Sequence, residues 1–212
     1  MRSGRRPSLL CRPGTGTSAR TAARRRARPL SNAELQAAAS STRATTIAKV
    51  LATPCPDTQL APEAANLPLV RSAVLCLVNR ERAQSGESPL ILNSQLERAA
   101  EGHDQEMIAE DYFAHVSPAG ETPVQRIQST TDYLPGPKVG YVIGENLAWG
   151  TLYLATPKAI VEAWIASPAH LANILESRYR ETGVGVTPSV PTALSGGQVG
   201  ATYAQEFGVL VH

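Results

Sequence analysis

Apolar residues recur at helical spacing in five segments between residues 67 and 175. The first segment predicts a helix from Pro68 to Gly86, with Val74 and Val78 on its buried face. The second predicts a helix that ends near Asp111. The caps that we expect at the five helix starts are Asn66, Ser94 in a capping box with Glu97, Thr122, Thr156 and Ser167.

The pattern changes to that of strands near the C-terminal end. Residues typical of strands fill 182–187 and 199–207, and the segment 188–197 between them has the composition of a loop. A third strand is predicted through either 141–143 or 147–149. Because the helical segments come first and the strands later, the chain is predicted to be an α+β protein with a small antiparallel sheet covered by helices.

The formal net charge of +2 conceals two differently charged parts of the chain. Residues 1–30 contain nine arginines and no acid, whereas the other 182 residues contain 11 basic and 18 acidic residues, a net charge of −7. The basic part has no interleaved aromatic residues, so we expect no nucleic-acid partner. Its Arg-, Ser-, Pro- and Gly-rich composition predicts a disordered or targeting segment.

The N-terminal part lacks the apolar run of a secretory signal. Such a signal needs about 7–15 apolar residues after its basic start, and the best stretch here, Thr45–Ala48, stops at Lys49. No run approaches the length of a transmembrane helix. We therefore predict a basic, largely disordered segment over 1–50, with a weak Ala-rich helix within 31–50, then a Pro-rich strap over 51–69 and a folded domain over 70–212.

Two of the three cysteines flank the entry to this domain. Cys55 lies between two prolines, where burial in a core is not expected, and Cys76 lies on the first helix. This placement favours a disulfide in an exported protein. The alternative is a pair of reduced thiols, with Cys76 as a small core residue. Cys11 lies in the basic segment and is expected to be unstructured.

Six short motifs carry a resemblance to a known family. They are Cys76–Arg82 (CLVNRER), His115–Pro118 (HVSP), Gly144–Asn146 (GEN), Trp164 with Ser167–His170 (SPAH), Gly183–Val186 (GVGV) and Tyr203–Phe207 (YAQEF). In this order they resemble the CAP superfamily, also called the SCP domain, and in particular its bacterial secreted branch. The resemblance covers about residues 70–208. It implies an α-β-α sandwich with a small antiparallel sheet between helical layers.

The resemblance also implies a setting for the protein. Members usually act outside the cell and have been linked to sterol or lipid binding, to glycans or cell walls, and to inhibition of other proteins. No single activity is shared among them. We therefore expect a secreted, extracellular monomer whose partner is a small ligand, lipid, glycan or peptide.

Eukaryotic members of the family carry two histidines and two glutamates in a cleft. The first histidine matches His115 and the first glutamate matches Glu145. The second glutamate corresponds to Ser167 and the second histidine falls near Thr202, so half of this tetrad is missing. Bacterial members often have another histidine that matches His170.

His115, Glu145 and His170 are accordingly the candidate catalytic or binding residues. Glu145 lies in an apolar run and needs a partner: it either pairs with His115 and raises the pKa of that ring, or holds its loop through backbone N–H groups. His170 lies in the first turn of a helix, which favours a neutral ring, and it is either a ligand or a packed side chain. His115 is either a cleft residue or a loop histidine bound to backbone. Further cleft candidates are Asn146, Ser167, Tyr203 and Gln205, of which the last two are otherwise ordinary sheet residues.

Two functions remain open at this point. The first is a binding module without catalysis, with the candidate residues lining its cleft. The second is a metal-assisted hydrolase of peptide or cell-wall bonds, in which His115, Glu145 and His170 hold zinc or another divalent cation. The motifs of the common hydrolases and nucleotide enzymes are missing from the sequence. A lesser hypothesis is that the basic segment contacts an anionic polymer or membrane.

Overall fold

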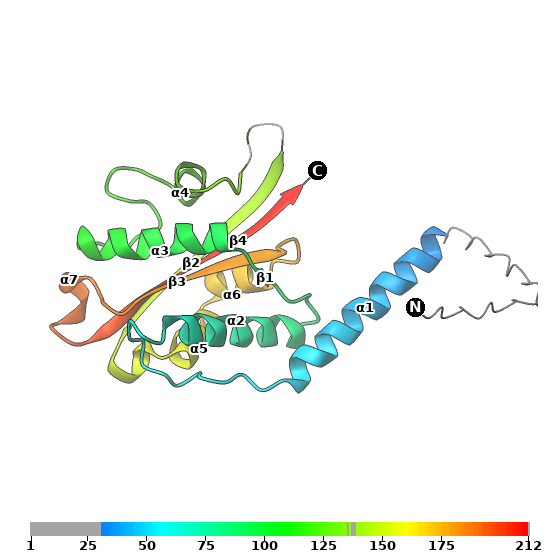
Figure 1. Ribbon diagram of the computed structural model, residues 1–212, viewed down its shortest axis with the longest axis horizontal. Helices are drawn as coiled ribbons and strands as arrows, with labels where there is room; N and C mark the ends of the chain where they lie inside the picture. Colours follow the sequence, from blue (N-terminus) through cyan, green and yellow to red (C-terminus); the bar gives the residue numbers. More distant parts are fainter. Residues whose placement is uncertain (1–30, 135, 137–138, 212) are drawn as a thin grey trace, which may run out of the picture.

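A mixed sheet lies between two layers of helices in the computed structural model (Figure 1). The structure describes residues 31–134, 136 and 139–211, so the predicted disorder of residues 1–30 lies outside it. The helices are α1 (Asn32–Ala52), α2 (Leu67–Gln84), α3 (Ser94–Ala109), α4 (Pro123–Thr130), the 3₁₀ turn η1 (Leu152–Ala155), α5 (Pro157–Ala166), α6 (Pro168–Leu175) and α7 (Thr192–Ser195). The strands are β1 (Ile91–Leu92), β2 (Gly140–Thr151), β3 (Glu181–Thr187) and β4 (Gly200–Val211).

The sheet has the order β1-β3-β4-β2, which leaves β2 at one edge. β2 and β4 pair antiparallel over their whole length, from Gly140 opposite Val211 to Thr151 opposite Gly200. Both places proposed for the third strand therefore belong to one long strand. β3 also pairs antiparallel with β4, but the two residues of β1 pair parallel with β3. The α-β-α sandwich and its antiparallel strands are confirmed, with the short β1 as a parallel addition.

The two faces of the sheet bury different sets of side chains. α3 and α4 cover one face, and α2, α5 and α6 cover the other (Figure 1). The larger core lies on the second face and includes Val74, Val78, Trp164, Tyr203 and Phe207. The core on the first face includes Leu96, Ala100, Met107, Leu147 and Ala204. Alternate residues of β2 and β4 therefore point to different layers.

Local sequence signals account for two of the predicted helix starts. The hydroxyl of Thr122 accepts a hydrogen bond from the backbone N–H of Gln125, whose side chain accepts one from the N–H of Thr122. The hydroxyl of Thr156 accepts from the N–H of Ala159. At both sites a proline follows the cap, as its fixed φ favours.

Three other predicted caps differ in the structure. The cap of α3 is Asn93, whose side chain accepts from the N–H groups of residues 95 and 96, so the predicted box of Ser94 with Glu97 is wrong by one residue. Asn66 precedes α2, but its side chain bonds the preceding turn at Glu63 and Ala61 instead. Ser167 precedes α6 without a side-chain cap. At α3 the neighbouring Asn93 takes the backbone donors, and at α2 the Asn66 side chain is engaged in the preceding turn.

The N-terminal part of the described chain is a helix followed by an irregular strap. α1 contains the weak helix that was expected, and none of its residues is buried. The strap is held to the body by hydrogen bonds from the Arg80 guanidinium to the carbonyl of Thr53 and from the Lys158 N–H to the carbonyl of Thr58. Among the described helices, none is long and apolar enough to cross a membrane.

Cys55 and Cys76 form a disulfide that ties the strap to α2, with their Cα atoms 5.6 Å apart. This disulfide was predicted from the placement of the two cysteines, over the alternative of two reduced thiols, and it is confirmed. The bond closes a loop with a sequence separation of 21 residues.

Replacing both Cys55 and Cys76 by serine should lower the free energy of unfolding by about 3 kcal/mol, because the unfolded chain regains the entropy that the closed loop removes. Urea denaturation of the oxidised protein and of the double variant measures this difference. The matched control is Cys11→Ser, which removes the remaining cysteine. Equal denaturation midpoints for the double variant and the wild type would contradict the expectation.

Candidate functional site

Glu145 is the centre of a polar site on the first face of the sheet. It lies in the middle of β2, and its side chain is only 2% exposed. An isolated buried carboxylate is costly, so it requires partners of opposite charge or hydrogen-bond donors. α3, α4 and the loop between them supply these partners.

His115 provides the exposed part of the site. Its Nδ1 lies 2.7 Å from Oε1 of Glu145, while the side chain is 53% exposed. The ring comes from the loop that joins α3 to α4, so a residue from one layer reaches an edge strand of the sheet. Only the family pattern related these two residues in the sequence, and the structure places them in direct contact.

Arg126 of α4 is the second partner of Glu145. Its Nη2 lies 3.1 Å from Oε2 of Glu145 and also donates to the backbone carbonyl of His115 at 3.1 Å. The guanidinium is almost fully buried, at 3% exposure of the side chain. One arginine therefore fixes both the carboxylate and the backbone of the loop that carries the histidine.

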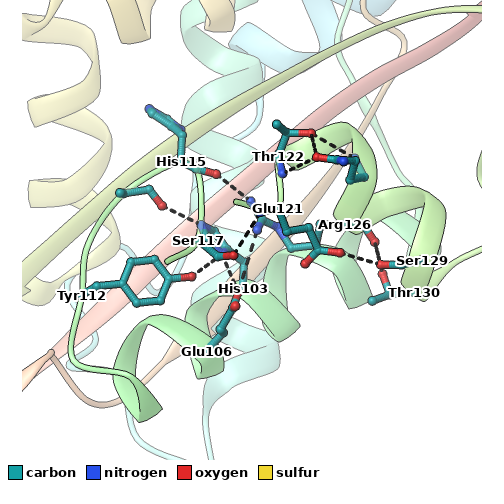
Figure 2. A network of polar contacts seen from close by, with 12 residues as sticks. His103, Glu106, Tyr112, His115, Ser117, Glu121, Thr122, Arg126, Ser129 and Thr130 are labelled. Carbon is teal, nitrogen blue, oxygen red and sulfur yellow. Dashed lines mark hydrogen bonds and ion pairs between the residues drawn. The ribbon is translucent and has the colours of Figure 1, made fainter. Parts of the chain in front are cut away.

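His103 of α3 lies next to this pair and is fully buried. Its Nε2 lies 3.0 Å from the carbonyl oxygen of Ala114 and 3.9 Å from Oε2 of Glu145. Its Nδ1 lies 3.4 Å from the hydroxyl of Tyr112 and 3.5 Å from Oε2 of Glu106 (Figure 2). Through Ala114 and Tyr112, these contacts hold the loop between α3 and α4 against α3.

Electrostatics give the two histidines opposite tendencies. The hydrogen bond with Glu145 raises the pKa of His115 above its ordinary value, and partial burial opposes it. Burial lowers the pKa of His103. Burial alone would raise the pKa of Glu145, but the hydrogen bond from His115, the neighbouring carboxyl group of Glu206 and the charges of His103 and Arg126 outweigh it and lower that pKa. The contact therefore favours the protonated form of the exposed ring and the ionised form of its carboxylate partner.

Two further acids lie fully buried next to Glu145. Glu206 of β4 is its direct partner across the strands, and Asp104 projects from α3. Burial raises the pKa of each well above its ordinary value, and the charge of Glu145 adds to the rise. Burial and the charge of Glu145 therefore favour the neutral form of both acids.

His170 lies in α6, next to β2 on the second face of the sheet. Its ring is half-buried, and its Nδ1 has no hydrogen-bond partner among the described residues. Its carbonyl accepts from Asn146, which points to the second face of the sheet. Burial lowers the pKa of His170, and repulsion from the charge of His115 lowers it further, as the predicted neutral ring requires. His170 is therefore near His115 without sharing its carboxylate.

Side chains from α5 and α6 bind the outward-facing backbone of β2. The Asn173 amide donates to the carbonyl of Glu145 and to the side chain of Asn146, at 3.1 and 3.0 Å. The indole N–H of Trp164 donates to the carbonyl of Leu147 at 3.0 Å. These contacts hold the strand that carries Glu145 in place.

The other predicted cleft residues are placed differently. Tyr203 and Gln205 are fully buried on the second face, where the Tyr203 hydroxyl donates to the carbonyl of Ala155 and the Gln205 amide donates to Thr182. Their burial gives no support to a role in lining an open cleft, and we leave them out of the proposed site. Ser167 is half-buried at the start of α6.

A hollow shared by His115, Glu145 and His170 stays a prediction. A hollow of about 420 Å³ lies elsewhere, against the strap and η1, and is lined by residues such as Pro62, Leu152 and Val199. The residues present do not fit a metal ion either, because no group of three or more His, Cys, Asp or Glu in the described chain is arranged to hold one. Nδ1 of His115 and both oxygens of Glu145 are already engaged.

Arg126 and Glu206 belong to the site but were not among the predicted residues. A weak signal for Glu206 exists in the sequence, since it alternates with Ala204 on a strand whose neighbours are apolar. Arg126 had a weaker one, as a charged residue next to Ile127 on a short helix. Neither signal names the partner, because Glu145 is 19 residues from Arg126 and 61 from Glu206.

Comparison with known proteins places this geometry in a family. YkwD, an uncharacterised protein of Bacillus subtilis, is 33% identical over 117 residues, which are 55% of this chain and 42% of that protein. The chain thus spans less than half the length of this curated relative. An extracellular SCP-domain protein of Bacillus anthracis superposes with a TM-score of 0.52 at 24% identity, covering 70% of this chain and 44% of that one.

An outer surface protein of Borrelia burgdorferi superposes with a TM-score of 0.50 at 19% identity, covering 68% of this chain and 92% of that one. At these identities the likeness to solved structures concerns the fold. The model of the cysteine-rich secretory protein family, CAP, matches residues 75–192, more than half of the chain. The chain therefore belongs to the CAP, or cysteine-rich secretory protein, family.

Proposed function

We propose that this protein is an extracellular binding module that holds a small ligand, glycan or peptide against the exposed ring of His115. The observation that carries the proposal is the 2.7 Å contact of this half-exposed ring with a carboxylate that is itself buried. A buried, fixed partner gives an exposed histidine a defined orientation and charge. Ser167 and His170 are the further residues that would offer polar groups to such a ligand. Asn146 is fully buried and binds the carbonyl of His170, so its part is to support the site.

The exposed ring has one nitrogen left for a ligand. Nδ1 is engaged by Glu145, and Nε2 of His115 makes no hydrogen bond to the residues that the structure describes. As an imidazolium it donates, which suits a carboxylate, carbonyl or hydroxyl oxygen of a glycan or peptide. The alternative of a zinc hydrolase has no comparable support, since the described residues do not form a group that fits a metal ion.

Two observations favour an extracellular location. The Cys55–Cys76 disulfide is of the kind that persists in oxidising compartments. The similar protein of Bacillus anthracis is described as extracellular. N-terminal sequencing of the native protein from culture supernatant and from cells would test export directly.

His115→Ala should weaken binding at least about tenfold, because a charge-assisted hydrogen bond contributes about 1.5–3 kcal/mol. The probes are chitooligosaccharides and short acidic, neutral and basic peptides, and NMR titration of the labelled protein measures binding. Glu145→Gln should weaken the binding of the same probe. Glu162→Gln, at an exposed position, should leave the affinity for that probe unchanged. Unchanged affinity in both His115→Ala and Glu145→Gln would rule out this site.

The affinity should also depend on pH in one direction. The pKa of His115 is raised in the folded protein, so the imidazolium is fully present below the ordinary histidine pKa of about 6.5 and is lost as the pH rises through the raised value. Binding of an acidic probe should therefore weaken on the alkaline side. An affinity that strengthens with rising pH would contradict the assignment of the cation to His115.

A further inference from the structure

Glu206 is a second buried acid whose protonation bears on the site. It lies directly opposite Glu145 in the antiparallel pair of β4 and β2, so both side chains leave the sheet on the same face. Glu206 is fully buried and Glu145 nearly so. Two carboxyl groups in such contact cannot both be ionised, because their repulsion is not screened by water.

The hydrogen bonds decide which of the two carries the proton. As a carboxylate, Glu206 has no hydrogen-bond donor for either oxygen among the described residues. With one proton it gains a partner, since its O–H can donate to the carboxylate of Glu145. Glu145 has donors of its own in His115 and Arg126, so Glu145 stays ionised and Glu206 stays neutral.

The other groups around Glu206 agree with this assignment. Asp104 faces it from α3, Arg126 from α4 and Glu145 from β2, while His103 of α3 lies against Glu145. Only Arg126 among the charged neighbours favours ionisation, and its Nη2 already binds Glu145. Burial and the charge of Glu145 outweigh it and raise the pKa of Glu206 well above the ordinary value.

We propose that Glu206 is a positioning residue that acts as a neutral carboxylic acid: its O–H donates to Glu145 and holds this carboxylate in place for His115. The positioning role rests on the proposed function of the site. The protonation itself does not, because no ligand enters the argument. The charge on the exposed histidine is thus supported by an uncharged acid on the neighbouring strand.

This arrangement makes the stability of the fold depend on pH in a definite direction. In the unfolded chain Glu206 releases its proton near the ordinary glutamate pKa of about 4.3. The folded protein keeps that proton up to the raised value, so it binds more protons than the unfolded chain between the two. The contribution of Glu206 to stability therefore falls as the pH rises above about 4.3.

Glu206→Gln tests the protonation. The amide N–H of glutamine can replace the O–H as donor to Glu145, but the amide does not ionise as the pH rises. Urea denaturation between pH 4 and pH 9 measures the free energy of unfolding. The value for the variant should increase relative to that of the wild type as the pH rises. The control Glu162→Gln, at an exposed position, should differ from the wild type by the same amount at every pH. A pH-independent difference for Glu206→Gln would overturn the proposal.

Infrared spectroscopy at neutral pH provides a direct signature. The carbonyl band of protonated carboxylic acids should be present in the wild type and should lose intensity in Glu206→Gln. Asp104→Asn is the comparison at the other fully buried acid, whose neutral form burial also favours: it should leave the part of the band that is lost in Glu206→Gln. An unchanged band in Glu206→Gln would mean that Glu206 is ionised, which overturns the proposal.

The positioning role has its own measurement. The NMR signals of the His115 ring are followed as the pH is lowered. They should change when Glu145 becomes protonated, because protonation ends the ion pair between Glu145 and His115. In Glu206→Met, which lacks a donor, this acid midpoint should move to higher pH, whereas Glu206→Gln and Asp104→Asn should keep it near the wild-type value. A shift in Glu206→Gln equal to that in Glu206→Met would overturn the role. If these results hold while His115→Ala binds every probe normally, only the proposed function fails.

Discussion

Replacing Arg126 by methionine should destabilise the protein by about 3–5 kcal/mol, because it leaves the buried carboxylate of Glu145 with one cationic partner fewer. The guanidinium is buried and also binds the carbonyl of His115, so the change removes two hydrogen bonds that water cannot replace. Methionine keeps most of the packing volume, and the loss therefore reports the polar contacts.

Urea denaturation at pH 7 measures the effect of Arg126→Met. The matched control is Arg178→Met, which removes an exposed arginine from its pair with Glu176 and should leave the midpoint unchanged. NMR of the His115 ring in the folded fraction should show a less ordered loop. A midpoint for Arg126→Met equal to that of the control would show that Glu145 does not depend on this partner.

Gly183→Val should destabilise the protein by a similar amount, because Gly183 of β3 lies where α3 packs against the sheet. A Cβ atom at Gly183 would lie 2.0 Å from the backbone nitrogen of Glu97, so α3 packs directly on the backbone of β3. A backbone atom cannot move aside as a side chain does. We expect a loss of more than about 3 kcal/mol, at the upper end for overpacked cores.

The control for this substitution is a glycine of α3, the helix that packs on Gly183. Gly102 of α3 has open space around the position of a Cβ, and Gly102→Ala should stabilise the helix by about 0.5–1 kcal/mol. Thermal unfolding followed by circular dichroism compares the two variants. Similar melting temperatures for Gly183→Val and the wild type would mean that α3 does not rest on β3 as closely as described.

The sequence predicted what depends on neighbouring residues. Thr122 and Thr156 begin helices because cap and proline stand side by side in the chain. The cap of α3 was misplaced by one residue because Asn93 and Ser94 are both good caps, and only the three-dimensional path of the chain selects between them. The parallel pairing of β1 could not be predicted from two residues.

The candidate site was predictable only as far as motifs reach. His115 and Glu145 were paired through the family pattern, and their contact is direct. Arg126 and Glu206 were missed because their roles depend on burial and on partners distant in the chain. The same limit explains Tyr203, since alternation on a strand indicates a shared face but not which layer covers it. Buried polar networks are therefore the part of a site that a single sequence specifies least visibly.

The contacts that fasten β2 from outside have a consequence for behaviour at high concentration. An edge strand of twelve residues offers its unpaired carbonyl groups to any other chain that approaches, which is a common route to aggregation. Asn173 and Trp164 occupy two of these acceptors in the middle of the strand. The side chains that steady Glu145 thus also keep one molecule from adding its strand to the sheet of another.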